Sequence, residues 1–128
     1  MSEKLSPKTK EFEEIVAKSS AEELEKLADD EDEEVRQKVA LHGNVSDALF
    51  RKLARDNSVL VRCAIPVNEN VTEEILMMLV DDSEWETRWN VANSNNASIE
   101  VLKRLVNDEV EPVRLSAQEH IDYLAQRN

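Results

Sequence analysis

The sequence repeats at intervals of 26 residues, and this period limits the folds open to the chain more than any other feature. The arginines that follow it are Arg36, Arg62, Arg88 and Arg114. Other recurring positions are Asp30, Asp56, Asp82 and Asp108, Leu27, Leu53, Leu79 and Leu105, and Ser20, Ser46, Thr72 and Ser98. Self-similarity at a fixed period is typical of proteins built from small stacked units. Residues that obey the period are expected to be structural, and function is sought where the period is broken.

Each unit is predicted to contain two short helices. In residues 20–45, Ser20 stands three residues before Glu23, which is the spacing of a capping box at a helix start. Val35 and Val39 lie four residues apart and define the buried face of the second helix. A helix pair this short cannot bury its own apolar faces, so the units must stack on one another.

One domain of 128 residues is expected, with four units at 20–45, 46–71, 72–97 and 98–123. Residues 1–19 are expected to form a capping helix that starts at Ser6-Pro7, and residues 124–128 a C-terminal tail. Gly43 and Asn44, with Asn70 and Asn96 in later units, suit a left-handed residue at the end of the second helix.

Composition favours helices and argues against several classes of partner. The chain has one glycine, 34% charged residues and a formal net charge of -12, which opposes binding to a phosphate backbone. No apolar stretch typical of a secretion signal stands at the N-terminus and no apolar run approaches the length of a membrane span, so neither is expected. The single cysteine, Cys63, cannot form an internal disulfide, so a reducing, cytoplasmic location is expected.

The repeated pattern resembles a known family. The first copy is Leu27-Ala28-Asp29-Asp30 followed by Val35-Arg36-Gln37-Lys38-Val39-Ala40, and the second begins at Leu53-Ala54-Arg55-Asp56. This pattern resembles the leucine-rich repeat variant family and its HEAT-like relatives over roughly residues 20–120. The resemblance implies an all-α, right-handed α-solenoid and says almost nothing about function. The proline that usually follows the aspartate in that family is missing here, and one cysteine cannot hold the iron–sulfur cluster of some members.

The recurring acids and arginines are predicted to form a structural ladder rather than acid–base pairs. A guanidinium offers five donors, so each arginine can bind aspartate side chains and helix-terminal carbonyls and tie one unit to the next. The predicted ladder consists of Asp30, Arg36, Asp56, Arg62, Asp82, Arg88, Asp108 and Arg114.

An uninterrupted acidic run precedes the second helix of the first unit. It lacks the alternating ligands and the central glycine of an EF-hand loop, so a solvated helix start is the favoured interpretation. It also remains a candidate electrostatic patch for a basic partner. The run consists of Asp29, Asp30, Glu31, Asp32, Glu33 and Glu34.

The sequence offers no arrangement suited to catalysis, a metal or a cofactor. His42 and His120 lie three units apart without recurring ligands, and Cys63 has no histidine close in sequence to act as its base. One glycine cannot build a phosphate-binding loop. We therefore predict that the protein is not an enzyme and holds no cofactor or metal.

Apolar residues break the period in the second helices of the middle units. Positions four apart share a helix face, and equivalent positions of stacked helices lie side by side, so these residues are predicted to form one area. Tryptophan is enriched at binding hot spots. The alternative is that the indole rings pack in the core, with Trp89 the better candidate for that. The predicted patch comprises Val59, Leu60, Cys63, Trp85, Trp89 and Leu115, next to a helix break at Pro66.

Three functional hypotheses follow. The first is a monomeric, non-catalytic module that binds a protein with a basic surface, and neither nucleic acid nor a membrane. Within this class the chain could be an immunity or antitoxin-type inhibitor of a basic nuclease toxin. The second is a nucleic-acid mimic that occupies a DNA-binding protein. The third, ranked last, is a DNA-repair or lyase-like enzyme on a HEAT-repeat scaffold.

Overall fold

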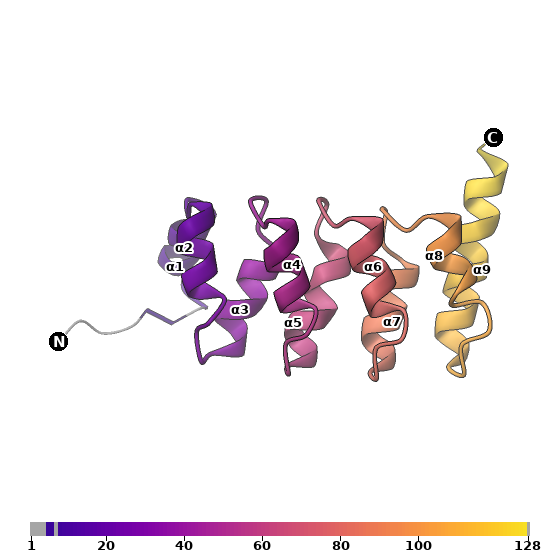
Figure 1. Ribbon diagram of the computed structural model, residues 1–128, viewed down its shortest axis with the longest axis horizontal. Helices are drawn as coiled ribbons and strands as arrows, with labels where there is room; N and C mark the ends of the chain where they lie inside the picture. The colour runs from indigo at the N-terminus through magenta and orange to yellow at the C-terminus, as the bar shows by residue number, and fades with distance from the viewer. Residues whose placement is uncertain (1–4, 7, 128) are drawn as a thin grey trace.

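The computed structural model describes residues 5–6 and 8–127, and within this part the chain is all-α (Figure 1). Short helices follow one another in pairs along the long axis of the molecule, from α1 at the indigo end to α9 at the yellow end. The elements are α1 Lys10–Ala17, α2 Ala21–Leu27, α3 Glu33–Ala40, α4 Asp47–Leu53, α5 Val59–Ala64, the 3₁₀ helix η1 Ile65–Val67, α6 Glu73–Leu79, α7 Trp85–Ala92, α8 Ile99–Lys103 and α9 Glu111–Gln126.

Two rows of helices run side by side. α4 packs against α6, and α6 against α8, while α3, α5, α7 and α9 pack one on the next in the second row. Within the pairs, α2 contacts α3, α6 contacts α7, and α8 contacts α9. Helices that are equivalent under the 26-residue period therefore lie next to each other.

Hydroxyl residues cap the helices of the first row, as their spacing predicted. Each accepts a hydrogen bond from the backbone nitrogen three residues on, and in α2 the side chain of Glu23 also accepts one from the nitrogen of Ser20, which completes a capping box. The caps are Ser20 at 3.2 Å, Ser46 at 3.1 Å, Thr72 at 3.4 Å and Ser98 at 3.2 Å.

The predicted start of the capping helix was wrong. α1 begins at Lys10, where the hydroxyl of Thr9 accepts a hydrogen bond of 3.1 Å from the nitrogen of Phe12. Ser6 instead provides the backbone carbonyl that receives the nitrogen of Thr9 at 3.1 Å. Pro7, the other half of the predicted pair, lies outside the described residues. A second hydroxyl three residues downstream therefore forms the cap.

Proline sets the length of α5. The helix ends at Ala64, and Ile65–Val67 continue as the 3₁₀ helix η1 with Pro66 in its first turn. Pro66 has no N–H to donate to the carbonyl of Arg62, and the nitrogen of Ile65 donates to that carbonyl instead. The predicted helix break is confirmed. α9 tolerates Pro112 because it lies in the first turn.

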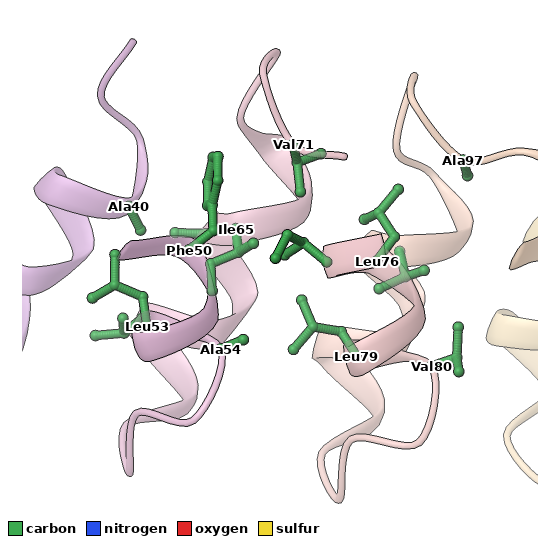
Figure 2. Packing of buried hydrophobic residues seen from close by; sticks show 14 of the residues in the cluster. Ala40, Phe50, Leu53, Ala54, Ile65, Val71, Leu76, Leu79, Val80 and Ala97 are labelled. Carbon is green, nitrogen blue, oxygen red and sulfur yellow. The ribbon is translucent and has the colours of Figure 1, made fainter. Parts of the chain in front are cut away.

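A continuous apolar core runs along the molecule from α2 to α9, and Figure 2 shows part of it. Leu53 and Leu79 occupy equivalent positions in α4 and α6, are 1% exposed, and lie in this core with Phe50, Ile65 and Leu76. Burying a side chain of this size contributes about 1.5–3 kcal/mol. A separate small cluster of Phe12, Val16 and Val35 attaches α1 to α3. The repeating apolar positions thus build the scaffold.

Candidate protein-docking surface

The recurring arginines link neighbouring helix pairs. Nε of Arg36 donates to Oδ2 of Asp56 at 2.8 Å, Nη2 donates to Oδ1 at 3.2 Å, and Nη1 donates to the carbonyl of Asp30 at 2.8 Å. Arg62 makes the equivalent bonds to Asp82 and to the carbonyl of Asp56. Arg88 repeats them with Asp108 and the carbonyl of Asp82. Each of these arginines thus binds both the loop before its own helix and the equivalent loop of the next helix pair.

Each aspartate that these arginines bind also accepts a hydrogen bond from the backbone nitrogen of the residue just before the next helix. Oδ1 of Asp56 accepts a hydrogen bond of 2.9 Å from the nitrogen of Ser58, and Oδ1 of Asp108 accepts one of 2.9 Å from Val110. Burial is the largest influence on the pKa of Asp108 and raises it. The hydrogen bonds from Arg88 and Val110 and the positive charges of Arg88 and Arg114 together outweigh burial, so this pKa lies below its ordinary value. Arg36, Arg62 and Arg88 and the aspartates that they bind thus hold neighbouring helix pairs together.

The last member of the ladder differs from the others. Nη1 of Arg114 donates to the carbonyl of Asp108 at 2.7 Å, and Nη2 lies 3.9 Å from a carboxylate oxygen of Glu111. Its side chain is 38% exposed, against 13% for Arg62. Arg114 thus contacts no aspartate carboxylate of a following helix pair within the described chain.

The predicted patch lies on the second row of helices. Trp85 and Trp89 lie one turn apart on α7 and are each 40% exposed, so the alternative that Trp89 is a core residue was wrong. Val59 on α5 and Leu115 on α9, the two neighbours of α7, are 38% and 53% exposed. We call the set Val59, Leu60, Cys63, Trp85, Trp89 and Leu115 the tryptophan patch.

Two members of the tryptophan patch, Leu60 and Cys63, are half-buried, whereas the other four are exposed. Sγ of Cys63 lies 3.2 Å from the hydroxyl of Thr87, which is fully buried on α7. Burial is the main cause that raises the pKa of the Cys63 thiol, so the thiol is neutral near pH 7. Through its contact with Thr87 the cysteine joins α5 to α7.

Carboxylates surround the apolar residues of the patch. Glu84 and Glu86 flank Trp85 in the chain, and all three are exposed. On α9, Glu111 and Glu119 lie one turn before and one turn after Leu115, and both are exposed. An apolar centre with a charged rim is the arrangement found at protein interfaces.

The acidic run before α3 is used mainly to start that helix. Asp32 caps α3 by accepting a hydrogen bond of 2.9 Å from the nitrogen of Glu34, and its own nitrogen donates to Oδ1 of Asp30 at 2.9 Å. Glu33 accepts a 2.6 Å hydrogen bond from the hydroxyl of Ser58 in the next helix pair. Of the remaining acids of the run, Asp29 and Glu31 are exposed and Glu34 is half-buried.

A second ladder, at the C-terminal ends of the second-row helices, was not predicted. The amide nitrogen of Asn68 donates to the carbonyls of Ala40 and His42, both at 2.8 Å. At equivalent positions, Nε2 of His42 lies 3.2 Å from the carbonyl of Ala17, and Nδ1 of His120 lies 2.9 Å from that of Ala92. Histidine and asparagine share this role, so no single residue type marked it in the sequence.

Asparagines at these ends act through their side chains, and the predicted left-handed residues are not present. No described residue has a positive φ, Gly43 included. Asn70 instead donates to the carbonyl of Gly43 at 3.0 Å, and Asn96 donates to those of Glu69 at 2.7 Å and Val71 at 2.9 Å. Carbonyls in the loop that follows one helix pair are thus satisfied by asparagine amides of the next pair.

No family model, no curated protein and no solved structure matches the chain. Among the described residues, no helix is both long and apolar enough to cross a bilayer, and no three potential ligands cluster as a metal would require.

Proposed function

We propose that the protein is a non-catalytic interaction module that binds a basic protein partner through the tryptophan patch. In this proposal the chain is a right-handed α-solenoid of four 26-residue, two-helix repeats with an N-terminal capping helix. It acts as a monomer in the cytoplasm. An extended row of helices presents a wide surface, and such repeat surfaces serve binding.

The observation that carries the proposal is the partial exposure of both tryptophans of the chain on one helix. Trp85 and Trp89 are each 40% exposed, in a chain with only 4% aromatic residues. Exposed Val59 and Leu115 extend the apolar area onto both neighbouring helices. A contiguous exposed apolar area with a polar rim marks an interaction site in a soluble protein.

Charge supports a basic partner. The net charge is -12, and the rim contains Glu84, Glu86, Glu111 and Glu119. A partner with lysines and arginines around an apolar anchor would be steered toward this surface and oriented on it. The association rate is expected to fall steeply as salt is raised.

The test uses a partner captured from the native host, identified and then purified. Its affinity is measured by calorimetry for the wild-type chain and for the double variant Trp85→Ala/Trp89→Ala. We expect the variant to bind at least about 30-fold more weakly, as for a hot spot of about 2 kcal/mol. Ile15→Ala, which shortens a 49% exposed apolar side chain on α1, is the control and should bind normally.

Equal affinity of the double variant and the wild type, with unchanged circular dichroism, would show that the tryptophan patch is not the docking site. Salt-insensitive binding would contradict the electrostatic part of the proposal. If the captured partner is a nuclease toxin or a DNA-binding protein, inhibition of its activity distinguishes an immunity protein or a nucleic-acid mimic from a simple scaffold.

A further inference from the structure

A groove rich in asparagine adjoins the tryptophan patch at the C-terminal ends of η1 and α7. It has a volume of about 360 Å³, and its walls include Asn68, Glu69, Asn90, Asn93, Asn95 and Asn96. A second hollow of about 350 Å³ shares Asn93 and Asn95 with it and reaches Glu119 on α9. Asn93 lies one turn after Trp89 on α7, which places the groove at the border of the tryptophan patch.

Most amide donors of this groove are already engaged within the fold. Both N–H groups of Asn68 and of Asn96 reach backbone carbonyls. Asn90 donates to the carbonyl of Cys63 at 2.8 Å, and Asn93 donates to that of Trp89 at 2.9 Å.

The side-chain oxygens of Asn90, Asn93, Asn95 and Asn96 accept no hydrogen bond from the residues that the structure describes. Each of these four oxygens can accept two hydrogen bonds, whereas the free amide N–H groups are one on Asn90, one on Asn93 and two on Asn95, so acceptor sites outnumber free amide donors in the groove. A ligand that only donates hydrogen bonds suits such a lining.

The electrostatics of the groove favour a cation. Glu69 lies in its wall, Glu119 lies in the adjoining hollow, and no lysine or arginine lines either hollow. The C-terminal end of α7 adds the partial negative charge of the helix dipole. All three contributions make the potential in the groove more negative and so favour a cation.

We propose that this groove binds an arginine side chain of the protein partner. A planar guanidinium has five donors, no acceptors and a permanent charge, which matches several carboxamide oxygens at once better than a lysine ammonium does. Its face can also stack on an exposed indole at the border of the groove. The inference deepens the proposed function, because it specifies what a basic partner would insert beside the tryptophans.

Arginine binding can be measured without the partner. The full ¹⁵N-labelled chain is titrated with N-acetyl-arginine amide, and the side-chain amide signals of Asn90, Asn93 and Asn95 are followed by NMR. Saturable shifts at millimolar probe concentrations are expected. N-acetyl-citrulline amide has nearly the same shape without the charge, and it should bind at least about fivefold more weakly. The lysine analogue should lie between the two.

Substitutions at Asn95 change the charge without changing the scaffold. Asn95 lines both hollows, is exposed, and its side chain forms no hydrogen bond within the described part of the chain. Asn95→Asp should tighten arginine binding about fivefold, and Asn95→Lys should weaken it at least as much. The control is Asn57→Lys, the same exchange at an exposed residue. Asn57 lies just before the N-terminal end of α5, whereas the groove lies beyond its C-terminal end.

Equal binding of arginine and citrulline would overturn the proposal, and so would equal effects of Asn95→Lys and Asn57→Lys. Absence of saturable shifts would overturn it as well. None of these results affects the test with Trp85→Ala/Trp89→Ala, so a failure of the groove is distinguishable from a failure of the tryptophan patch.

Discussion

Arg62 holds the carboxylate of Asp82 with two hydrogen bonds, from Nε at 2.8 Å and from Nη2 at 3.3 Å. Its third bond, from Nη1 to the carbonyl of Asp56 at 2.8 Å, fixes the loop from which its own helix starts. The side chains of Arg62 and Asp82 are only 13% and 6% exposed. One guanidinium therefore joins two consecutive helix pairs in a place that water scarcely reaches.

Arg62→Ala is expected to destabilise the fold by about 3 kcal/mol, because it leaves the Asp82 carboxylate buried without its partner. Arg114→Ala should cost about 1 kcal/mol or less, since Arg114 is more exposed and loses chiefly its bond to the carbonyl of Asp108. Chemical denaturation of the two variants measures the difference. The reverse order would contradict a linking role for the recurring arginines.

Asn68→Ala is expected to destabilise the fold by about 2 kcal/mol. Asn68 is 5% exposed and satisfies the carbonyls of Ala40 and His42, which would be left without that donor. Asn70→Ala is the matched comparison, because Asn70 is exposed and its side chain donates only to the carbonyl of Gly43. It should cost less than 1 kcal/mol in the same urea titration. Equal losses would show that the buried amide has no special role in the second ladder.

The stabilisation from Asp108 should be lost in acid. Its pKa is lowered in the folded chain, so the contribution is fully present above the ordinary value of 3.8 and disappears as pH falls through the lower folded value. Asp108→Asn should be about 2 kcal/mol less stable than wild type at neutral pH. The difference in stability between Asp108→Asn and the wild type should narrow below about pH 4. A constant gap down to pH 2 would exclude ionisation of Asp108 as its source.

The 26-residue period was sufficient to predict helices, caps and the apolar core, because these depend on local spacing and on residue type. Ser46 and Thr72 cap helices, and Leu53 and Leu79 are buried, as expected from their positions in the 26-residue repeat. The second ladder escaped prediction because the residue type changes along its repeat position, which holds His42, Asn68, Ser94 and His120. The role that His42, Asn68 and His120 share depends on which carbonyls the preceding pair leaves open.

The candidate docking surface was predictable only as a helix face. Spacing placed Val59 and Trp85 at equivalent positions of adjacent helices, but it could not predict how deeply each side chain is buried between the helices. The asparagine groove was not predicted at all. It depends on the 3₁₀ turn that Pro66 imposes and on amides of Asn90 and Asn93 that bind backbone carbonyls, and neither effect has a signature in the repeat.

Quenching of fluorescence by acrylamide tests the exposure of the two indoles separately. Trp85→Phe and Trp89→Phe each leave one tryptophan, and both proteins should be quenched clearly, because each indole is 40% exposed in the wild type. Their emission should be red-shifted relative to a buried indole and should shift blue when a partner covers the tryptophan patch. A single shielded, blue-shifted tryptophan in either variant would place that ring in the core and remove it from the docking surface.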